Sequence, residues 1–127
     1  MTTAAGIAFV AVTAGAVAFQ LALAAGAPWG AYAMGGAYPG AFPPRLRIAA
    51  VIQAVVLVLL AIVVSARAGL FEVPLVTAQP WLVWLAVAFS GASLALNAIS
   101  RSAGERRIWV PVAAVMLGAS LIVALQP

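Results

Sequence analysis

The sequence contains no cysteine and no histidine, and only two of its 127 residues are acidic, Glu72 and Glu105. The missing cysteines exclude disulfides, and the missing thiols and imidazoles exclude the usual zinc sites. The common catalytic mechanisms need an activated nucleophile, paired acids or a metal site, and the sequence lacks the residues for each of them. We therefore expect a protein that is not an enzyme and that holds no metal or cofactor.

Charge of either sign is also scarce. Charged residues make up 6% of the chain, 67% of it is hydrophobic, and the mean hydropathy is +1.22. Soluble domains carry roughly a quarter charged residues, so this composition cannot supply a soluble surface. The basic residues are all arginines and give a formal net charge of +4. They lie in the connections between apolar runs, so this charge does not indicate a nucleic-acid partner.

Long apolar runs are what the sequence does contain. A helix needs about 20 apolar residues to cross a bilayer, and four runs reach that length. Each run should be a continuous helix, because unpaired backbone groups cannot face lipid. The first run is not expected to be a cleaved signal peptide, since no basic residue precedes it and it exceeds a typical signal core. The sequence predicts an all-α, polytopic membrane protein with one transmembrane domain, residues 1–127, as an up-down bundle of helices at 4–25, 46–66, 81–100 and 108–125.

The arginines predict how the bundle is oriented. We call the three connections loop 1 (residues 26–45), loop 2 (residues 67–80) and loop 3 (residues 101–107). Only Arg67 belongs to loop 2, whereas the others lie in or beside loops 1 and 3: Arg45, Arg47, Arg101, Arg106 and Arg107. By the positive-inside rule, loops 1 and 3 should be cytoplasmic and both termini should lie outside, in the cell inner (plasma) membrane.

The larger polar side chains of the helices gather near the same two loops. With a rise of about 1.5 Å per residue, Gln20, Gln53 and Asn97 each lie within about 10 Å of that interface, and Ser93 shares a helix face with Asn97. These side chains should turn inward, because an amide that faces lipid would be unpaired. Two interpretations are open: the side chains hold the helices together through interhelical hydrogen bonds, or they line a polar vestibule that opens to the cytoplasm.

Loop 1 combines five glycines and four prolines with large side chains that include Trp29 and Tyr32. Glycine and proline favour a chain of turns, while aromatic side chains are too apolar for a solvated linker. We therefore expect loop 1 to pack on the bundle. It would serve either as a lid over the vestibule or as an interfacial clip whose Arg45 and Arg47 contact anionic lipid.

Loop 3 carries the only acid near these arginines. Ser102 and Glu105 have the spacing of a capping box, which predicts a helix start near Ala103. We expect Glu105 to pair with one of its basic neighbours, Arg47, Arg101 or Arg106. In this interpretation Arg47, Glu105 and Arg106 form a latch between loops 1 and 3, and Arg107 joins the lipid headgroup contacts.

Two segments also carry a resemblance. "GAPWGAYAMGG" followed by "FPPRLR", together with "LNAISRSAGERRIWVPV", is similar to a family of small four-helix integral membrane proteins that is common in high-GC actinobacteria and present in Firmicutes. The likeness covers nearly the whole chain and implies the same topology, but no activity is assigned to that family. Its members often have an acid directly after Pro-Trp-Gly, where this chain has Ala31, so no role for such an acid transfers.

Small residues recur every three or four positions in the first run (Ala4, Ala8, Ala11, Gly15, Ala18, Ala22) and in the last (Ala114, Gly118, Ser120). Such stripes let helices approach closely, which predicts a homo-oligomer or packing in a larger membrane complex. We expect an oligomeric conduit or transporter for small or anionic solutes, because arginines at the mouth attract anions. The alternative is an accessory or scaffold subunit of a larger membrane complex, or a lipid-binding protein whose partners are anionic membrane lipids.

Overall fold

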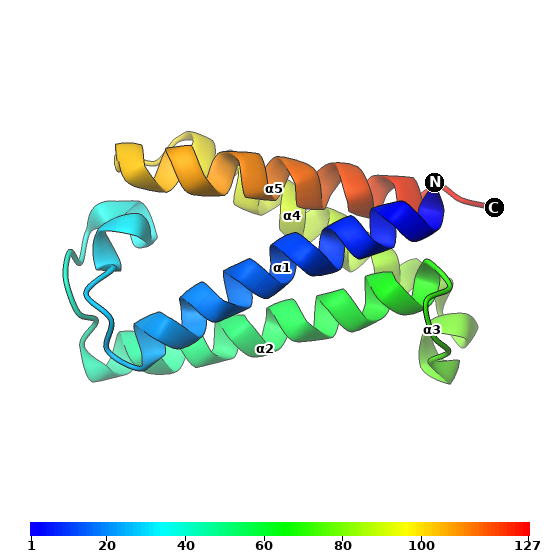
Figure 1. Ribbon diagram of the computed structural model, residues 1–127, viewed down its shortest axis with the longest axis horizontal. Helices are drawn as coiled ribbons and strands as arrows, with labels where there is room; N and C mark the ends of the chain where they lie inside the picture. The colour runs from blue at the N-terminus through cyan, green and yellow to red at the C-terminus, as the bar shows by residue number, and fades with distance from the viewer.

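The computed structural model describes all 127 residues and contains helices but no strands. Its long helices are α1 (Thr2–Ala24), α2 (Pro44–Arg67), α4 (Val83–Ala98) and α5 (Ala103–Ala124). They alternate in direction, so loops 1 and 3 lie at one end of the bundle, and loop 2 and both termini lie at the other (Figure 1). Four helices are long and apolar enough to span a membrane, the third including the turn before α4. The predicted four-helix membrane bundle is confirmed, and the chain is a multi-pass membrane protein.

The helix ends differ from the predicted ones for local reasons. α5 begins at Ala103, ahead of the apolar span at 108–125 and where the capping box predicted it, because the Ser102 Oγ accepts a hydrogen bond from the Glu105 N–H at 3.1 Å and caps the first turn. α2 begins at Pro44, where a residue without an N–H suits the first turn. Short helices that the apolar runs did not predict fill the connections: η1 (Gly30–Tyr32) and η2 (Met34–Gly36) in loop 1, and α3 (Pro74–Ala78) and η3 (Pro80–Leu82) in loop 2.

The helices do not pack equally on one another. α1 lies along α2 and α5, and α4 lies along α5, whereas α2 and α4 pack on each other over a much smaller surface. Figure 1 shows α2 and α5 diverging toward the end that carries loop 1 (cyan), which lies across that end. We call this the loop 1 end of the bundle and the opposite one the termini end. The bundle is therefore more tightly packed at the termini end.

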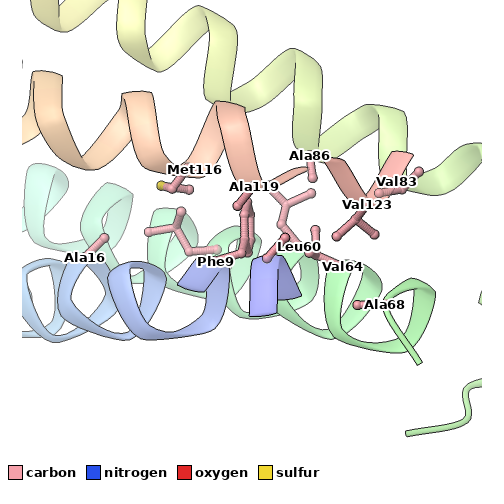
Figure 2. Close-up of a cluster of buried hydrophobic side chains, with 12 residues drawn as sticks. Phe9, Ala16, Leu60, Val64, Ala68, Val83, Ala86, Met116, Ala119 and Val123 are labelled. Atoms are coloured by element: carbon pink, nitrogen blue, oxygen red, sulfur yellow. The ribbon is translucent and has the colours of Figure 1, made fainter. Parts of the chain in front are cut away.

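The apolar core fills the half of the bundle at the termini end. Phe9 of α1 is fully buried and lies among Leu60 and Val64 of α2 and Met116 and Val123 of α5 (Figure 2). Side chains of this size interdigitate at close to crystal density and leave no path for water. The bundle is closed to solvent in this half.

Outside the core, large apolar side chains point away from the bundle. Along α2, the exposed fraction of Ile48, Ile52, Val55 and Leu59 lies between 53% and 64%. A soluble protein rarely presents so large an apolar surface to water, but acyl chains cover it at no cost in a bilayer. The exposed surface therefore fits a membrane environment.

Adding one methyl group to α1 tests how closely it packs on the end of α2. A Cβ added at Gly6 would lie 2.7 Å from the Cβ of Ala68, whereas a Cβ added at Gly15 would meet nothing within 4 Å. Gly6→Ala should lower the free energy of unfolding by about 1–3 kcal/mol, the usual cost of overpacking. Gly15→Ala, the control in the same helix, should raise it by up to about 1 kcal/mol through helix propensity. Equilibrium unfolding in mixed detergent and dodecyl sulfate micelles measures both, and equal stabilities would contradict the packing.

Candidate functional site

A cavity of about 380 Å³ lies at the loop 1 end, between loop 1 and helices α1, α2 and α4. We call this cavity the vestibule. A smaller space of about 90 Å³ lies next to it, toward the core and against α5, and we call it the inner chamber. The structure brings together the four polar residues predicted from their depth, since Gln20, Gln53, Ser93 and Asn97 line both spaces. They surround the place where the two spaces meet.

These four side chains make no hydrogen bond with one another. The Asn97 Nδ2 donates to the Ser93 carbonyl oxygen of its own helix at 2.7 Å, and the Gln20 and Gln53 amides have no partner in the chain. Neither glutamine side chain is fully enclosed, so its donors and acceptors remain available to the cavity. The interhelical hydrogen bonds of the first interpretation are absent among these four side chains, and all four line a cavity.

Two unpaired hydroxyl groups lie beyond the lining of both spaces, nearer the termini end. Thr13 and Ser90 are 1% and 0% exposed, and neither hydroxyl oxygen has a hydrogen-bond partner. Thr13 lies seven residues before Gln20, and Ser90 lies three residues before Ser93, in each case on the same helix face. Beyond them the apolar core around Phe9 closes the bundle. In this conformation the vestibule and the inner chamber are closed toward the termini end.

Loop 1 forms one wall of the vestibule and is anchored to the helices. Phe42 is 4% exposed and packs with Leu23 of α1 and Ala50 of α2 in a small second core. The Arg47 Nε donates to the Phe42 carbonyl oxygen at 2.8 Å and fixes the end of the loop on the first turn of α2. The expected packed loop is what the structure contains.

The middle of loop 1 is hydrogen-bonded to the first turn of α5. The Ser102 Oγ donates to the Ala31 carbonyl oxygen at 2.7 Å, and the Gly35 N–H donates to the Glu105 Oε2 at 2.9 Å. Gly35 has a φ of +67°, a left-handed conformation that costs glycine nothing. The two residues of the capping box thus hold loop 1 as well as starting the helix.

A third contact lies one turn further along α5. The Trp109 Nε1 donates to the Tyr32 carbonyl oxygen at 2.9 Å. The Tyr32 ring packs on Gly104 so closely that a Cβ there would lie 2.5 Å from the Tyr32 Cε1. Phe19 of α1 stacks on Trp29 with ring centroids 6.3 Å apart and lies against Trp109 at 4.7 Å. Aromatic rings from loop 1, α1 and α5 therefore meet at the edge of the vestibule.

The predicted ion pair of Glu105 is wrong. Glu105 binds the backbone of loop 1 and makes no ion pair with an arginine. The Arg47 guanidinium is held by the Phe42 carbonyl oxygen, and the Arg106 guanidinium by the Ser100 carbonyl oxygen just before its own helix. The latch between the two loops exists, but a carboxylate and a backbone N–H form it in place of two charged side chains.

The arginines also lie away from the cavity. None of them lines the vestibule, and Arg45, Arg101 and Arg107 are exposed at the surface of the loop 1 end. The ionisable side chains in the lining are the buried Glu105 carboxylate and the Tyr32 phenol. The vestibule therefore holds no positive charge that would attract an anion.

Comparison with protein-family models gives no match, and comparisons with curated proteins and with solved structures give none either. The resemblance noted above thus stays a prediction based on its two motifs. In the structure these motifs touch each other, because the loop 1 segment around Ala31 and Gly35 is bound by Ser102 and Glu105.

Sequence reasoning missed part of the lining. It placed Glu105 in a surface cluster, yet this carboxylate is 6% exposed and lines the vestibule with the aromatic side chains of Phe19 and Phe42. One signal was available: Gly104 lies inside the first turn of a helix, where a glycine often marks a close approach by another group.

The fit of Tyr32 on Gly104 can be tested through the exposure of loop 1. Gly104→Ala should displace the ring and weaken the attachment of the loop by about 1–2 kcal/mol, so chymotrypsin should cut loop 1 about tenfold faster in detergent micelles. Gly118→Ala is the matched control, because it adds a methyl group to the same helix with nothing within 4 Å. If both variants were cut at the wild-type rate, Tyr32 would not hold the loop.

Proposed function

We propose that the protein binds a small polar solute in the vestibule and works as the entrance of a conduit or transporter. The observation that carries this proposal is the pair of amides, Gln20 and Gln53, which line the vestibule without a partner in the chain. An unpaired amide away from water costs about 1–3 kcal/mol, so water or a solute that pairs with it is favoured there. Side chains that served only to join helices would be paired with each other.

Loop 1 is the lid in this proposal. It covers the vestibule through Tyr32 and Met34, which are both about half exposed, and it is anchored at its far end by the buried Phe42. Opening needs the breaking of the few hydrogen bonds to α5 and of the ring contacts of Trp29 and Tyr32, while Phe42 keeps the loop attached. Active-site and transport lids work in this way, on a firm hinge with a weaker contact at the tip.

Passage across the whole membrane needs more than one conformation of one chain, because the core closes the termini end. The exposed face of α1 offers a surface for a second copy: Ala11, Gly15 and Ala18 are exposed, as are Ala114 and Gly118 on α5. Small residues at such a surface allow close helix contact in lipid. We therefore include a homo-oligomer in the proposal.

The same small-residue surface supports a second candidate, an accessory subunit of a larger membrane complex. In that case a partner helix covers α1, and the vestibule holds water or a lipid headgroup. The anionic lipid contacts expected from the sequence also belong to this candidate, through the exposed Arg45 and Arg107.

Solute movement tests the first candidate. Proteoliposomes containing the purified chain should take up glycerol or urea faster than protein-free liposomes. Gln53→Leu should slow the moving solute about fivefold, because one hydrogen bond of about 1 kcal/mol is lost, and adding Asn97→Leu should slow it further. Ile52→Leu, at the adjacent position that is 60% exposed, should change nothing.

If none of these solutes moves and the double variant keeps its oligomeric state, the conduit proposal is overturned. The accessory candidate then gains support from a defined membrane protein that co-purifies in mild detergent and is lost in Gly15→Leu. Both outcomes are read from the same purified material.

The proposed orientation places loops 1 and 3 in the cytoplasm and both termini outside, because five of the six arginines lie at the loop 1 end. The chain has no cysteine, so single-cysteine variants report one site each. In intact spheroplasts a membrane-impermeant maleimide should label Gln79→Cys in loop 2 and leave Ala37→Cys in loop 1 unlabelled until the cells are broken. The reverse pattern would refute the orientation.

A further inference from the structure

Glu105 is the one acidic group of the vestibule, and no arginine forms an ion pair with it. Its Oε2 accepts the Gly35 N–H at 2.9 Å, while its Oε1 accepts no hydrogen bond and is not enclosed by protein atoms. The side chain is nevertheless 94% buried as a whole, with 6% exposed, and it lines the cavity. A carboxylate held in such a place attracts a cation, because few competing waters surround it.

The other walls of the vestibule also suit a cation with an organic surface. The aromatic side chains of Phe19, Tyr32 and Phe42 belong to the lining, and ring faces attract ammonium groups. The amide oxygens of Gln20 and Gln53 are free to accept hydrogen bonds from an N–H donor. No guanidinium lines the cavity, so no positive charge competes for Glu105.

The lining of the vestibule reaches exposed residues of two helices. Its lining includes Ala49 of α2 and Leu96 of α4, which are both exposed, Leu96 by 65%. These two helices pack on each other much less than α1 packs on α2 or α4 on α5, and Ala49 lies about 8 Å inside the start of α2 at about 1.5 Å per residue. Because exposed residues at this depth of a membrane bundle meet lipid, a molecule could insert its polar head into the vestibule beside them and keep its alkyl chain in the bilayer.

We propose that the vestibule is a binding site for an ammonium group, with Glu105 as its counter-charge, and that ammonium compounds enter it from the bilayer beside Ala49 and Leu96. This inference rests on the proposed function, because it assigns a ligand class to the same cavity. It also replaces the anionic solutes expected from the arginines with a cationic head. The ammonium group could belong to an amphiphile of the membrane or to a soluble molecule, and both present the same chemistry to Glu105.

Tryptophan fluorescence tests this proposal, since Trp29 and Trp109 flank the lining residue Phe19. The full chain in dodecyl maltoside micelles is titrated with dodecyltrimethylammonium, and with dodecyldimethylamine oxide at a pH where that analogue is uncharged. We expect a saturable change with the ammonium compound and binding about tenfold weaker for the amine oxide, because only the former pairs with the carboxylate.

The Glu105→Gln variant removes the charge but keeps an oxygen that can accept the Gly35 N–H, so loop 1 should stay in place. We expect it to bind the ammonium compound about tenfold more weakly and the amine oxide as wild type does. Glu72→Gln is the matched control, because it removes the other acid, which is exposed in loop 2. This control should bind both compounds as wild type does.

A soluble probe, benzyltrimethylammonium, distinguishes the two sources of the ligand. If it competes with dodecyltrimethylammonium, the site recognises the head alone; if it does not, the alkyl chain and entry from the bilayer are needed. Equal wild-type affinity for the charged and uncharged dodecyl compounds would overturn the ammonium proposal, whatever the behaviour of the variant. In that case uptake of glycerol or urea by proteoliposomes still decides the proposed function separately.

Discussion

Loop 1 is held over the open end of the bundle by hydrogen bonds from the first turns of α5, and the vestibule exists because of them. The Ser102 hydroxyl and the Glu105 carboxylate each bind a backbone group of the loop, and Trp109 binds a third. Backbone groups of an irregular segment need partners when they lie near lipid, and here the start of a helix supplies those partners. If these hydrogen bonds were lost, loop 1 would no longer cover the cavity, which would become an open cleft between the helices.

The two halves of the bundle have different interiors. At the termini end Phe9, Val64 and Val123 fill the interior, so dispersion contacts hold the helices together where lipid offers no hydrophobic gain. At the loop 1 end the helices diverge, and the space is lined by amides and aromatic rings (Figure 1). The apolar core is concentrated in one half, which allows the other half to contain a cavity and an irregular loop.

The sequence predicted the helices well and the contacts of loop 1 less well. Helix length and apolarity predicted the four spans, and the capping box of Ser102 and Glu105 predicted the start of α5. Depth along the helices was enough to group Gln20 with Gln53, because amides at equal depth turn to the interior rather than face lipid unpaired. The Glu105 ion pair failed for a physical reason: counting charges near an acid ignores backbone N–H groups, and one of these, in a glycine with positive φ, is its actual partner.

The closed core at the termini end also determines how strongly the membrane voltage affects a charged ligand in the vestibule. A charge that crosses the whole bilayer gains or loses about 2.3 kcal/mol per 100 mV. A charged molecule that enters the vestibule and stops before the residues around Phe9 crosses only the shallow part of that field. Its occupancy would then depend on the concentrations in one compartment and in one leaflet, and would change little when the cell depolarises.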